Sequence, residues 1–151
     1  MENLLISACL LGVECKYSGG SNALPEETIG KLRARYRLIP VCPETAGGLP
    51  TPRDPSERIG ERVVSCRGAD VTQQFKKGAQ AALTLARRYG CTTALMKEHS
   101  PSCGSGLIYD GSFSGKLVKG DGCAAELLKA AGVFVVGENM TELLTMVCKA
   151  E

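Results

Sequence analysis

The sequence predicts an α/β protein: a single Rossmann-like domain over residues 1–151, with a mostly parallel sheet, helices on both faces and a small hairpin excursion. A chain of 151 residues has the length of one ordinary domain, and its 44% of hydrophobic residues suffice for a packed core. Short apolar runs, typical of buried parallel strands, alternate with helix patterns. The expected order is strand–helix–strand, hairpin excursion, then helix–strand–helix–strand–helix.

The first part of the chain carries two strands separated by a helix. Residues 3–9 form a continuous apolar run, which indicates a buried strand. Residues 25–36 begin with a proline and two glutamates, a favourable helix start, and residues 37–42 give the second strand. The segment 42–60 is rich in proline and glycine. It is long for a passive connection, so we expect a functional loop there.

The middle of the chain predicts a small hairpin and a long helix. Residues 62–66 and 69–71 are expected to pair as the hairpin. Asp70 then precedes a helix, with Gln73 at the spacing of a capping box, and Gly90 ends the helix. The apolar stripe of this helix consists of Phe75, Ala79, Ala82, Leu83 and Ala86. The remaining elements are a strand over 92–96, an excursion over 107–119, a helix over 121–131, a strand over 133–136 and a final helix started by Asn139 and Glu142.

Composition argues against several classes of protein. The net charge is only +2 and no basic arm is present, so we expect no nucleic-acid partner. No stretch approaches the roughly 20 apolar residues of a membrane-spanning helix, so we expect no membrane partner. The apolar run near the start is short and lacks a basic leader, which does not indicate a signal peptide. The expected location is the cytoplasm.

Cysteine is unusually frequent. The eight cysteines are Cys9, Cys15, Cys42, Cys66, Cys91, Cys103, Cys123 and Cys148. Without an export signal, and with a core of normal size, they favour metal or redox chemistry over disulfides. The sequence contains no C-x-x-C pair, which weakens the zinc-ribbon and thioredoxin interpretations. The single histidine, His99, excludes a histidine-rich metal site.

Three of the cysteines fall at the predicted carboxyl ends of strands. Cys9 ends the first strand, Cys42 ends the second, and Cys103 lies in the loop after the fourth. Ligands of open α/β sheets bind at this edge, so the three thiols are candidate ligands. Thiolates suit zinc, copper(I) or iron–sulfur clusters, and three of them would leave one iron of a cubane open. The competing interpretation is that they are small core residues.

The other cysteines are expected to have different roles. Cys15 lies in a glycine-rich loop near the proposed site, so its role stays open. The cysteines read as core residues are Cys66, Cys91, Cys123 and Cys148.

Polar residues flank the cysteine trio. Glu44 follows Cys42 by two positions, and a carboxylate there could move a proton. Ser100 and Ser102 precede Cys103, and a hydroxyl there could orient a substrate or a water. A first-turn acid and a turn serine are the commoner roles for such residues. Arg53 could hold a substrate or, more commonly, brace the long loop.

Tyr17 has two possible roles. It could stack on a planar ligand, although packing is the commoner role of such a residue.

Several motifs carry a resemblance to a known family. The motifs are SACLLGVECKYSGG (7–20), CPETAGGLPTPR (42–53), DVTQQFKKGA (70–79), KEHSPSCGSG (97–106), IYDGSFSGK (108–116) and GDGCAAELL (120–128). Together they span nearly the whole chain. They resemble a family of short bacterial proteins that includes the thiouracil desulfurases.

The resemblance implies a 4Fe-4S cluster held by Cys9, Cys42 and Cys103, with one iron open to the sulfur of a thiolated pyrimidine. It implies that water or hydroxide replaces sulfur on carbon without net redox change. Glu44 would act as the acid/base and Ser100 would assist. The small thiolated base is the expected partner, and the sulfur acceptor is unknown.

Two alternatives to this function remain open at the level of sequence. One is a non-catalytic iron–sulfur or zinc-binding module for sulfur delivery or redox sensing. The other is a metal-free nucleotide-binding domain, which the absence of a G-x-G-x-x-G or P-loop motif disfavours.

Overall fold

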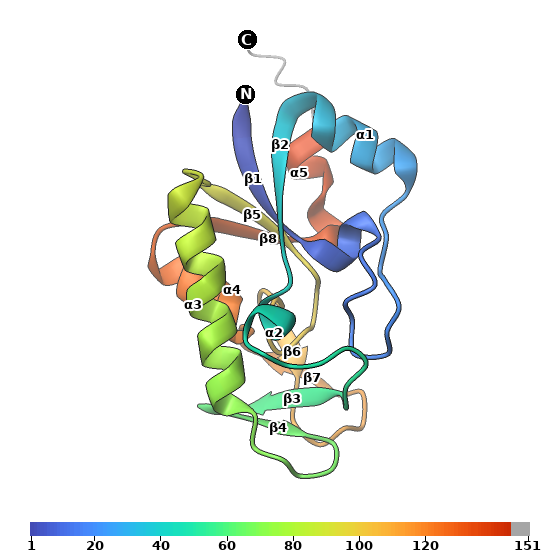
Figure 1. The fold of residues 1–151 in the computed structure, drawn as a ribbon, viewed down its shortest axis with the longest axis vertical. Helices are drawn as coiled ribbons and strands as arrows, with labels where there is room; N and C mark the ends of the chain where they lie inside the picture. The colour runs from blue at the N-terminus through green and yellow to red at the C-terminus, as the bar shows by residue number, and fades with distance from the viewer. Residues whose placement is uncertain (146–151) are drawn as a thin grey trace.

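The protein is built on a parallel four-stranded sheet (Figure 1). The structure is a computed structural model that describes residues 1–145. The strand order is β2 (Tyr36–Val41), β1 (Glu2–Ser7), β5 (Thr93–Met96) and β8 (Phe134–Gly137), and all three pairings are parallel. The predicted α/β class with a mostly parallel sheet is therefore confirmed.

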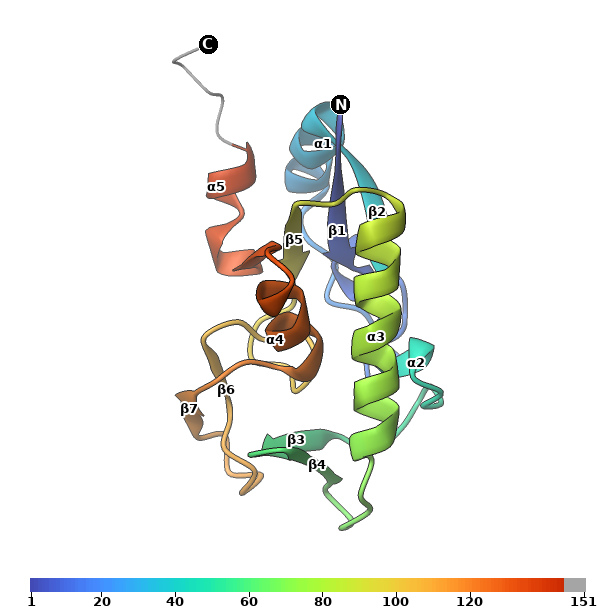
Figure 2. The same cartoon turned by 90° about the vertical axis from the view of Figure 1, so that its left-hand side faces the viewer.

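One face of the sheet is covered by α3 (Thr72–Arg88) and α4 (Cys123–Ala130) (Figure 2). Leu5 of β1 belongs to this side of the core, together with the apolar stripe of α3. All five stripe residues predicted from the 3.6-residue period are buried. Alanines dominate the contact between α3 and the sheet, which lets the helix lie close to the strands.

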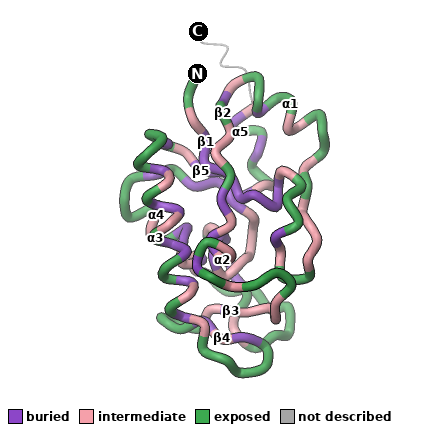
Figure 3. The backbone as a smooth tube through the Cα atoms, in the orientation of Figure 1, coloured by how far each residue is buried: buried purple, intermediate pink, exposed green. Residues whose placement is uncertain are grey.

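The opposite face carries α1 (Glu26–Arg35) and α5 (Glu142–Thr145). Leu4 and Ile6 of β1 point to this side, because successive strand residues alternate between faces. The buried purple segments in Figure 3 follow the sheet between these two helix layers. The prediction of helices on both faces is confirmed. No helix within residues 1–145 is long and apolar enough to cross a membrane.

Short elements gather beyond the carboxyl ends of the strands. They are the 3₁₀ helix η1 (Ala8–Leu11), the short helix α2 (Pro43–Ala46), the hairpin of β3 (Ser56–Ile59) and β4 (Arg62–Ser65), and the hairpin of β6 (Leu107–Tyr109) and β7 (Leu117–Lys119). The two hairpins lie near each other below the sheet in Figure 1. The short helix α2 lies in the segment 42–60, which is expected to be a loop, whereas the hairpin of β6 and β7 corresponds to the expected excursion over 107–119. Residues of η1, α2, β3 and β6 line the cavity described below.

The first hairpin differs from the prediction. It pairs β3 with β4 around Gly60, whereas the expected strand over 69–71 is reduced to an isolated bridge between Val64 and Asp70. Gly60 has a φ of 58°, a left-handed turn conformation that glycine adopts without steric cost. The turn residues of the Pro- and Gly-rich segment 42–60, which predict a loop, therefore concealed the strand β3.

The start of α3 also differs. Val71 occupies the N-cap position, so the predicted capping box of Asp70 with Gln73 is wrong. The Asp70 carboxylate instead accepts the backbone N–H of Thr72 at 3.0 Å. Hydrogen bonds from Thr72 lower the pKa of Asp70. A carboxylate at this end of a helix also complements the macrodipole.

The final helix is interrupted. Asn139 lies in a 3₁₀ helix, η2 (Glu138–Met140), and α5 begins separately at Glu142. The prediction that Asn139 and Glu142 start one final helix is thus wrong, because the two residues belong to separate short helices.

Candidate active site

A cavity of about 510 Å³ opens at the carboxyl ends of β1, β2 and β5. The five predicted site residues all line it: Cys9, Cys42, Glu44, Ser100 and Cys103. This is the sheet edge at which α/β proteins bind ligands. The fold therefore brings the cysteine trio and its two polar companions to one place.

Each cysteine of the trio is positioned by a different element. Cys9 lies in η1 directly after β1, and it is 8% exposed. Cys42 is the N-cap residue of α2, which follows β2 without a gap. Cys103 lies in the loop after β5 and is 5% exposed.

The helix α2 that carries Cys42 is seated tightly on α3. A Cβ added to Gly78 of α3 would lie 1.8 Å from the Pro43 carbonyl oxygen, and one added to Gly47 would lie 2.0 Å from the Gln74 oxygen. The two backbones are therefore in direct contact, with no room for a side chain between them. This contact fixes the position of α2, and with it Cys42 and Glu44.

The thiols influence one another electrostatically. Burial raises the pKa of Cys9, and the charge of Cys42 adds to this effect, whereas a hydrogen bond with Asn22 opposes it. Burial raises the pKa of Cys103 to about 12, with further contributions from Glu44 and Cys9. Such thiols hold their protons unless a cation compensates the thiolate charge. The environment thus favours thiolates only when a metal is bound.

The donor set fits a soft, multinuclear metal group better than one ion. Within residues 1–145, no three His, Cys, Asp or Glu side chains are arranged to hold a single metal ion. An iron–sulfur cluster needs no such convergence, because each thiolate binds a separate iron. Three cysteines that line one cavity, two of them buried, are compatible with that requirement.

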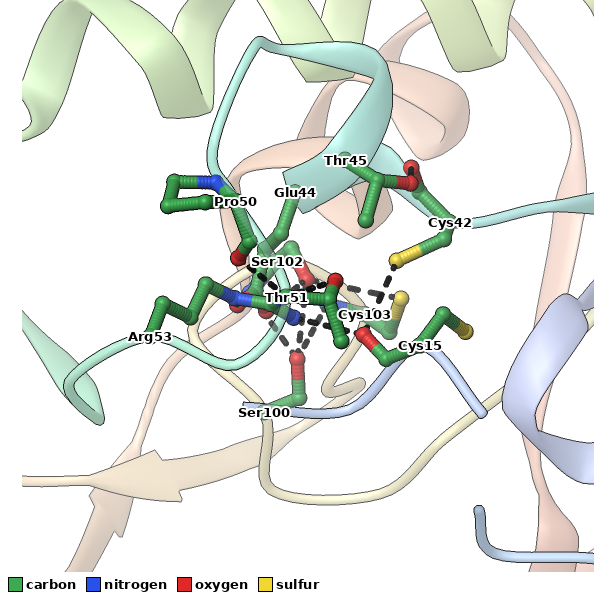
Figure 4. A network of polar contacts seen from close by, with 10 residues as sticks. All are labelled: Cys15, Cys42, Glu44, Thr45, Pro50, Thr51, Arg53, Ser100, Ser102 and Cys103. Carbon is green, nitrogen blue, oxygen red and sulfur yellow. Dashed lines mark hydrogen bonds and ion pairs between the residues drawn. The ribbon is translucent and has the colours of Figure 1, made fainter. Parts of the chain in front are cut away.

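A chain of hydrogen bonds joins Ser100 to Glu44 through Ser102 (Figure 4). The Ser102 hydroxyl donates to Oε2 of Glu44 at 2.8 Å, and its oxygen lies 2.9 Å from the Ser100 hydroxyl. Because the single Ser102 proton points to Glu44 in this arrangement, Ser100 donates to Ser102. Within residues 1–145, Ser100 is therefore connected to Glu44 by hydrogen bonds that pass through Ser102.

Ser100 and Ser102 have distinct surroundings. The Ser100 oxygen accepts the backbone N–H groups of Ser102 at 3.1 Å and Cys103 at 3.0 Å. Ser102 is 2% exposed, and its hydroxyl also lies 3.5 Å from the Cys103 sulfur. The sequence suggested the same role for Ser102 as for Ser100, the orientation of a substrate or a water, and did not indicate the contact with Glu44.

Arg53 holds the other oxygen of Glu44. Its Nε donates to Oε1 at 3.0 Å, and the two side chains are only 6% and 16% exposed. The same guanidinium donates to the carbonyl oxygens of Cys15 at 2.9 Å and Pro50 at 3.2 Å, and to the Thr51 hydroxyl. Arg53 thus braces the long loop, the commoner of its two expected roles. Both oxygens of Glu44 are fixed by the protein.

Cys15 lies beside the trio. It lines the same cavity, and its carbonyl oxygen is 3.7 Å from the Cys42 sulfur. Burial raises the pKa of Cys15 to about 12, and the neighbouring Cys42 contributes. Its backbone also anchors Arg53, so Cys15 connects the first loop of the chain to Glu44.

The remaining cysteines lie elsewhere. Cys91 is a buried core residue as predicted, and Cys123 is half-buried on α4. Cys66 is exposed, so its assignment to the core is wrong: it follows β4 in a surface turn. Cys148 lies outside the described residues. The seven cysteines within residues 1–145 are free thiols.

Comparison with known proteins places these residues in a family. The family model of 2-thiouracil desulfurase matches residues 4–140. The protein named "Uncharacterized protein YbbK" of Bacillus subtilis (strain 168) is 42% identical over 146 residues, which cover 90% of this chain and 95% of that protein. A solved structure of a [4Fe-4S]-dependent thiouracil desulfidase, TudS, is 44% identical, with a TM-score of 0.92 and full coverage of both chains. The chain belongs to the 2-thiouracil desulfurase family.

Proposed function

We propose that this protein is an iron–sulfur-dependent desulfurase that replaces the sulfur of a thiolated pyrimidine, such as 2-thiouracil, by oxygen from water. The observation that carries the proposal is the cavity lined by three thiols, two of them buried, and by a carboxylate held at both oxygens. Membership of the 2-thiouracil desulfurase family supports the reaction type. The likeness to a structure described as [4Fe-4S]-dependent supports the cofactor.

In this proposal Cys9, Cys42 and Cys103 hold a 4Fe-4S cluster. When bound, such a cluster would supply an iron with a free coordination position, a Lewis acid for the sulfur that leaves the pyrimidine carbon. Three protein thiolates and a cavity open to a small planar molecule are consistent with that role.

Glu44 is the proposed general base. It accepts a proton from the water that forms the new carbon–oxygen bond while the carbon–sulfur bond breaks. The sulfur leaves with the bonding electron pair, so no oxidant or reductant is consumed. Arg53 and Ser102 each hold one oxygen of the carboxylate, which fixes its orientation at the cavity.

Ser100 is the proposed assistant of Glu44. Its proton is directed to Ser102, and the Ser102 proton is directed to Glu44, so the three groups form a continuous path for a proton. The two backbone N–H groups on the Ser100 oxygen fix the direction of this path.

Anaerobic preparation tests the proposal. We expect about four irons and four sulfides per chain, and release of uracil from 2-thiouracil. Replacing Cys9, Cys42 or Cys103 by alanine should abolish both iron content and turnover. Cys66→Ala is the matched control, because Cys66 is exposed and outside the cavity.

Two results would contradict the proposal in different ways. Full iron content in all three cavity variants would refute the ligand set. A loaded protein that turns over no thiolated pyrimidine would favour a non-catalytic metal module. Cytoplasmic location and the absence of a nucleic-acid partner stay predictions, which cell fractionation and gel-shift assays would test.

A further inference from the structure

We propose that Tyr17, Tyr109 and Phe113 form an aromatic rim over the cavity that stacks on the ring of a planar heterocyclic substrate, and that Glu57 positions Phe113 for this contact. This inference rests on the proposed function, and it names the part of the site that recognises the ring. The cysteines and Glu44 act on the sulfur and its carbon, whereas the aromatic rim would act on the rest of the molecule.

The three aromatic rings come from separate segments of the chain. Tyr17 lies in the loop after η1, Tyr109 ends β6, and Phe113 lies in the connection from β6 to β7. All three line the same cavity as the cysteine trio. Their exposed fractions are 48%, 36% and 38%, whereas Cys9 and Cys103 are almost fully buried. Cys9 and Cys103 are therefore shielded from solvent, whereas the three rings lie on the solvent-accessible side of the cavity.

Glu57 ties Phe113 to the body of the protein. One carboxylate oxygen of Glu57 accepts the backbone N–H groups of Gly111 at 2.9 Å and Phe113 at 3.0 Å. Glu57 is only 8% exposed, although it is charged. Burial of a carboxylate is costly unless its hydrogen bonds compensate. Here the compensating donors are the backbone of the segment that carries Phe113.

The tip of the second hairpin is docked on the first hairpin (Figure 1). A Cβ added to Gly111 would lie 2.2 Å from Cγ1 of Ile59 on β3, so the two segments are in tight contact there. Gly111 has a φ of 96°, which a residue with a side chain rarely adopts. The segment 110–115 is therefore held by both packing and hydrogen bonds, and Phe113 is not on a free loop.

Backbone strain is concentrated beside the aromatic rim. Within residues 1–145, the non-glycine residues with positive φ are Phe113 at 57° and His99 at 65°. The ring of His99 makes an edge contact with Tyr109 at 6.0 Å between centroids. Such conformations persist where the surrounding structure imposes them, and they cluster at ligand-binding sites. Both strained residues support a ring of the aromatic rim.

The chemistry of the aromatic rim points to a flat, uncharged ring. Aromatic faces bind heterocyclic bases by stacking, which is tolerant of ring substituents and contributes about 1–3 kcal/mol per base. The three rings are partly exposed at the cavity, and burial of such apolar surface is favourable. A stacked substrate ring would cover this surface.

Variants of Phe113 test the stacking contact. On the anaerobic holoenzyme, we expect Phe113→Leu to weaken binding of uracil about tenfold by calorimetry, within the range for loss of one stacking contact. The KM for 2-thiouracil should rise by a similar factor with kcat unchanged, because the contact is the same in ground and transition states. Phe113→Trp should restore both values. Leu117→Ala is the matched control on the same hairpin, since Leu117 is similarly exposed but lies outside the cavity.

Variants of Glu57 test its positioning role. Glu57→Ala removes the acceptor for the Phe113 segment and should raise KM as Phe113→Leu does. Glu57→Gln keeps an acceptor oxygen and should retain the native KM. If Glu57→Ala does not fold, the Phe113 variants still decide the main point. A loss of kcat rather than a rise in KM would show a general structural role and overturn the assignment of Glu57.

The outcomes separate this inference from the proposed function. Unchanged uracil affinity and KM in Phe113→Leu would overturn the aromatic rim while leaving the desulfurase intact. A wild-type holoenzyme that releases no uracil from 2-thiouracil would overturn the proposed function. In that case the calorimetric comparison of wild type, Phe113→Leu and Phe113→Trp would still decide whether the aromatic rim binds the ring.

Discussion

Ser102 shows how much of the site depends on a single side chain. It is buried, it donates to Glu44, and it is the one contact through which Ser100 reaches the carboxylate in the described structure. Arg53 completes this arrangement from the other side. The orientation of Glu44 is therefore set by two residues from loops that are far apart in sequence.

Removal of the Ser102 hydroxyl should impair catalysis without removing the metal. We expect Ser102→Ala to lower kcat at least tenfold, because it breaks the path from Ser100 and leaves Oε2 of Glu44 without its donor. Iron content per chain should stay at the wild-type value, since no ligand changes. Steady-state kinetics and iron analysis on the same anaerobic sample measure both quantities.

Ser105→Ala is the control for this substitution. Ser105 lies in the same loop, but it does not line the cavity. Wild-type kcat in Ser102→Ala would contradict the role of Ser102, and a parallel loss of iron would show that it supports the Cys103 loop instead.

At the scale of elements, the short helix α2 depends on a glycine of its neighbour. Gly78 lies where α3 meets the Pro43 backbone, and a side chain there would collide with a carbonyl oxygen at 1.8 Å. A backbone group has little freedom to move away. The sequence shows Gly78 only as an unfavourable residue inside a helix, and the packing explains why it is there.

We expect Gly78→Ala to displace α2 and destabilise the protein by about 1–3 kcal/mol, the usual cost of overpacking. Cys42 and Glu44 belong to the displaced segment, so iron content and turnover should fall together. Urea denaturation of the anaerobic protein gives the stability change, and iron analysis gives the effect on the site.

Gly30→Ala is the matched control within a helix. Gly30 lies in α1 with nothing within 4 Å of an added Cβ. Alanine should stabilise α1 there by about 0.5–1 kcal/mol, because it has the higher helix propensity. If both substitutions had the same effect, the contact between α2 and α3 would not determine the stability of the site.

At the scale of the whole molecule, the cavity is lined by segments that follow separate strands of the sheet. The cysteine trio follows β2, β1 and β5, which are adjacent in the sheet order. A group bound by all three residues therefore ties three strand ends together. Burial raises the pKa of Cys9 and Cys103, so these two thiols hold their protons in the apo protein, which has no comparable connection between the strand ends.

The holoenzyme should accordingly be more stable than the apo form. We expect a higher Tm for the anaerobic holoenzyme than for the same protein after chelation, because a ligand that binds only the folded state stabilises it. Cys103→Ala should abolish the difference and Cys66→Ala should preserve it. Equal Tm values for the wild-type holo and apo forms would contradict the inference that a group bound by the three cysteines connects the strand ends.

The predictions from sequence were most accurate where the signal is local. The apolar runs gave the four strands, and the helix period gave the buried stripe of α3. The errors fall where local signals compete: the turn residues around 42–60 concealed β3, and Asp70 binds Thr72 rather than forming a capping box. Placement of Cys66 in the core failed because β4 ends at Ser65, so that Cys66 lies in the surface turn after it.

The sequence by itself determined the alternation of strands and helices and the location of Cys9, Cys42 and Cys103 at strand ends, because both follow from short-range periodicity and parallel connections. Only the tertiary structure decided that Ser102 stands between Ser100 and Glu44, and that Glu57 holds the Phe113 segment. Ser102 and Glu44 are 58 residues apart in the chain, and Glu57 and Phe113 are 56 residues apart. No local pattern encodes such contacts, because they depend on how loops from different strands meet at one edge of the sheet.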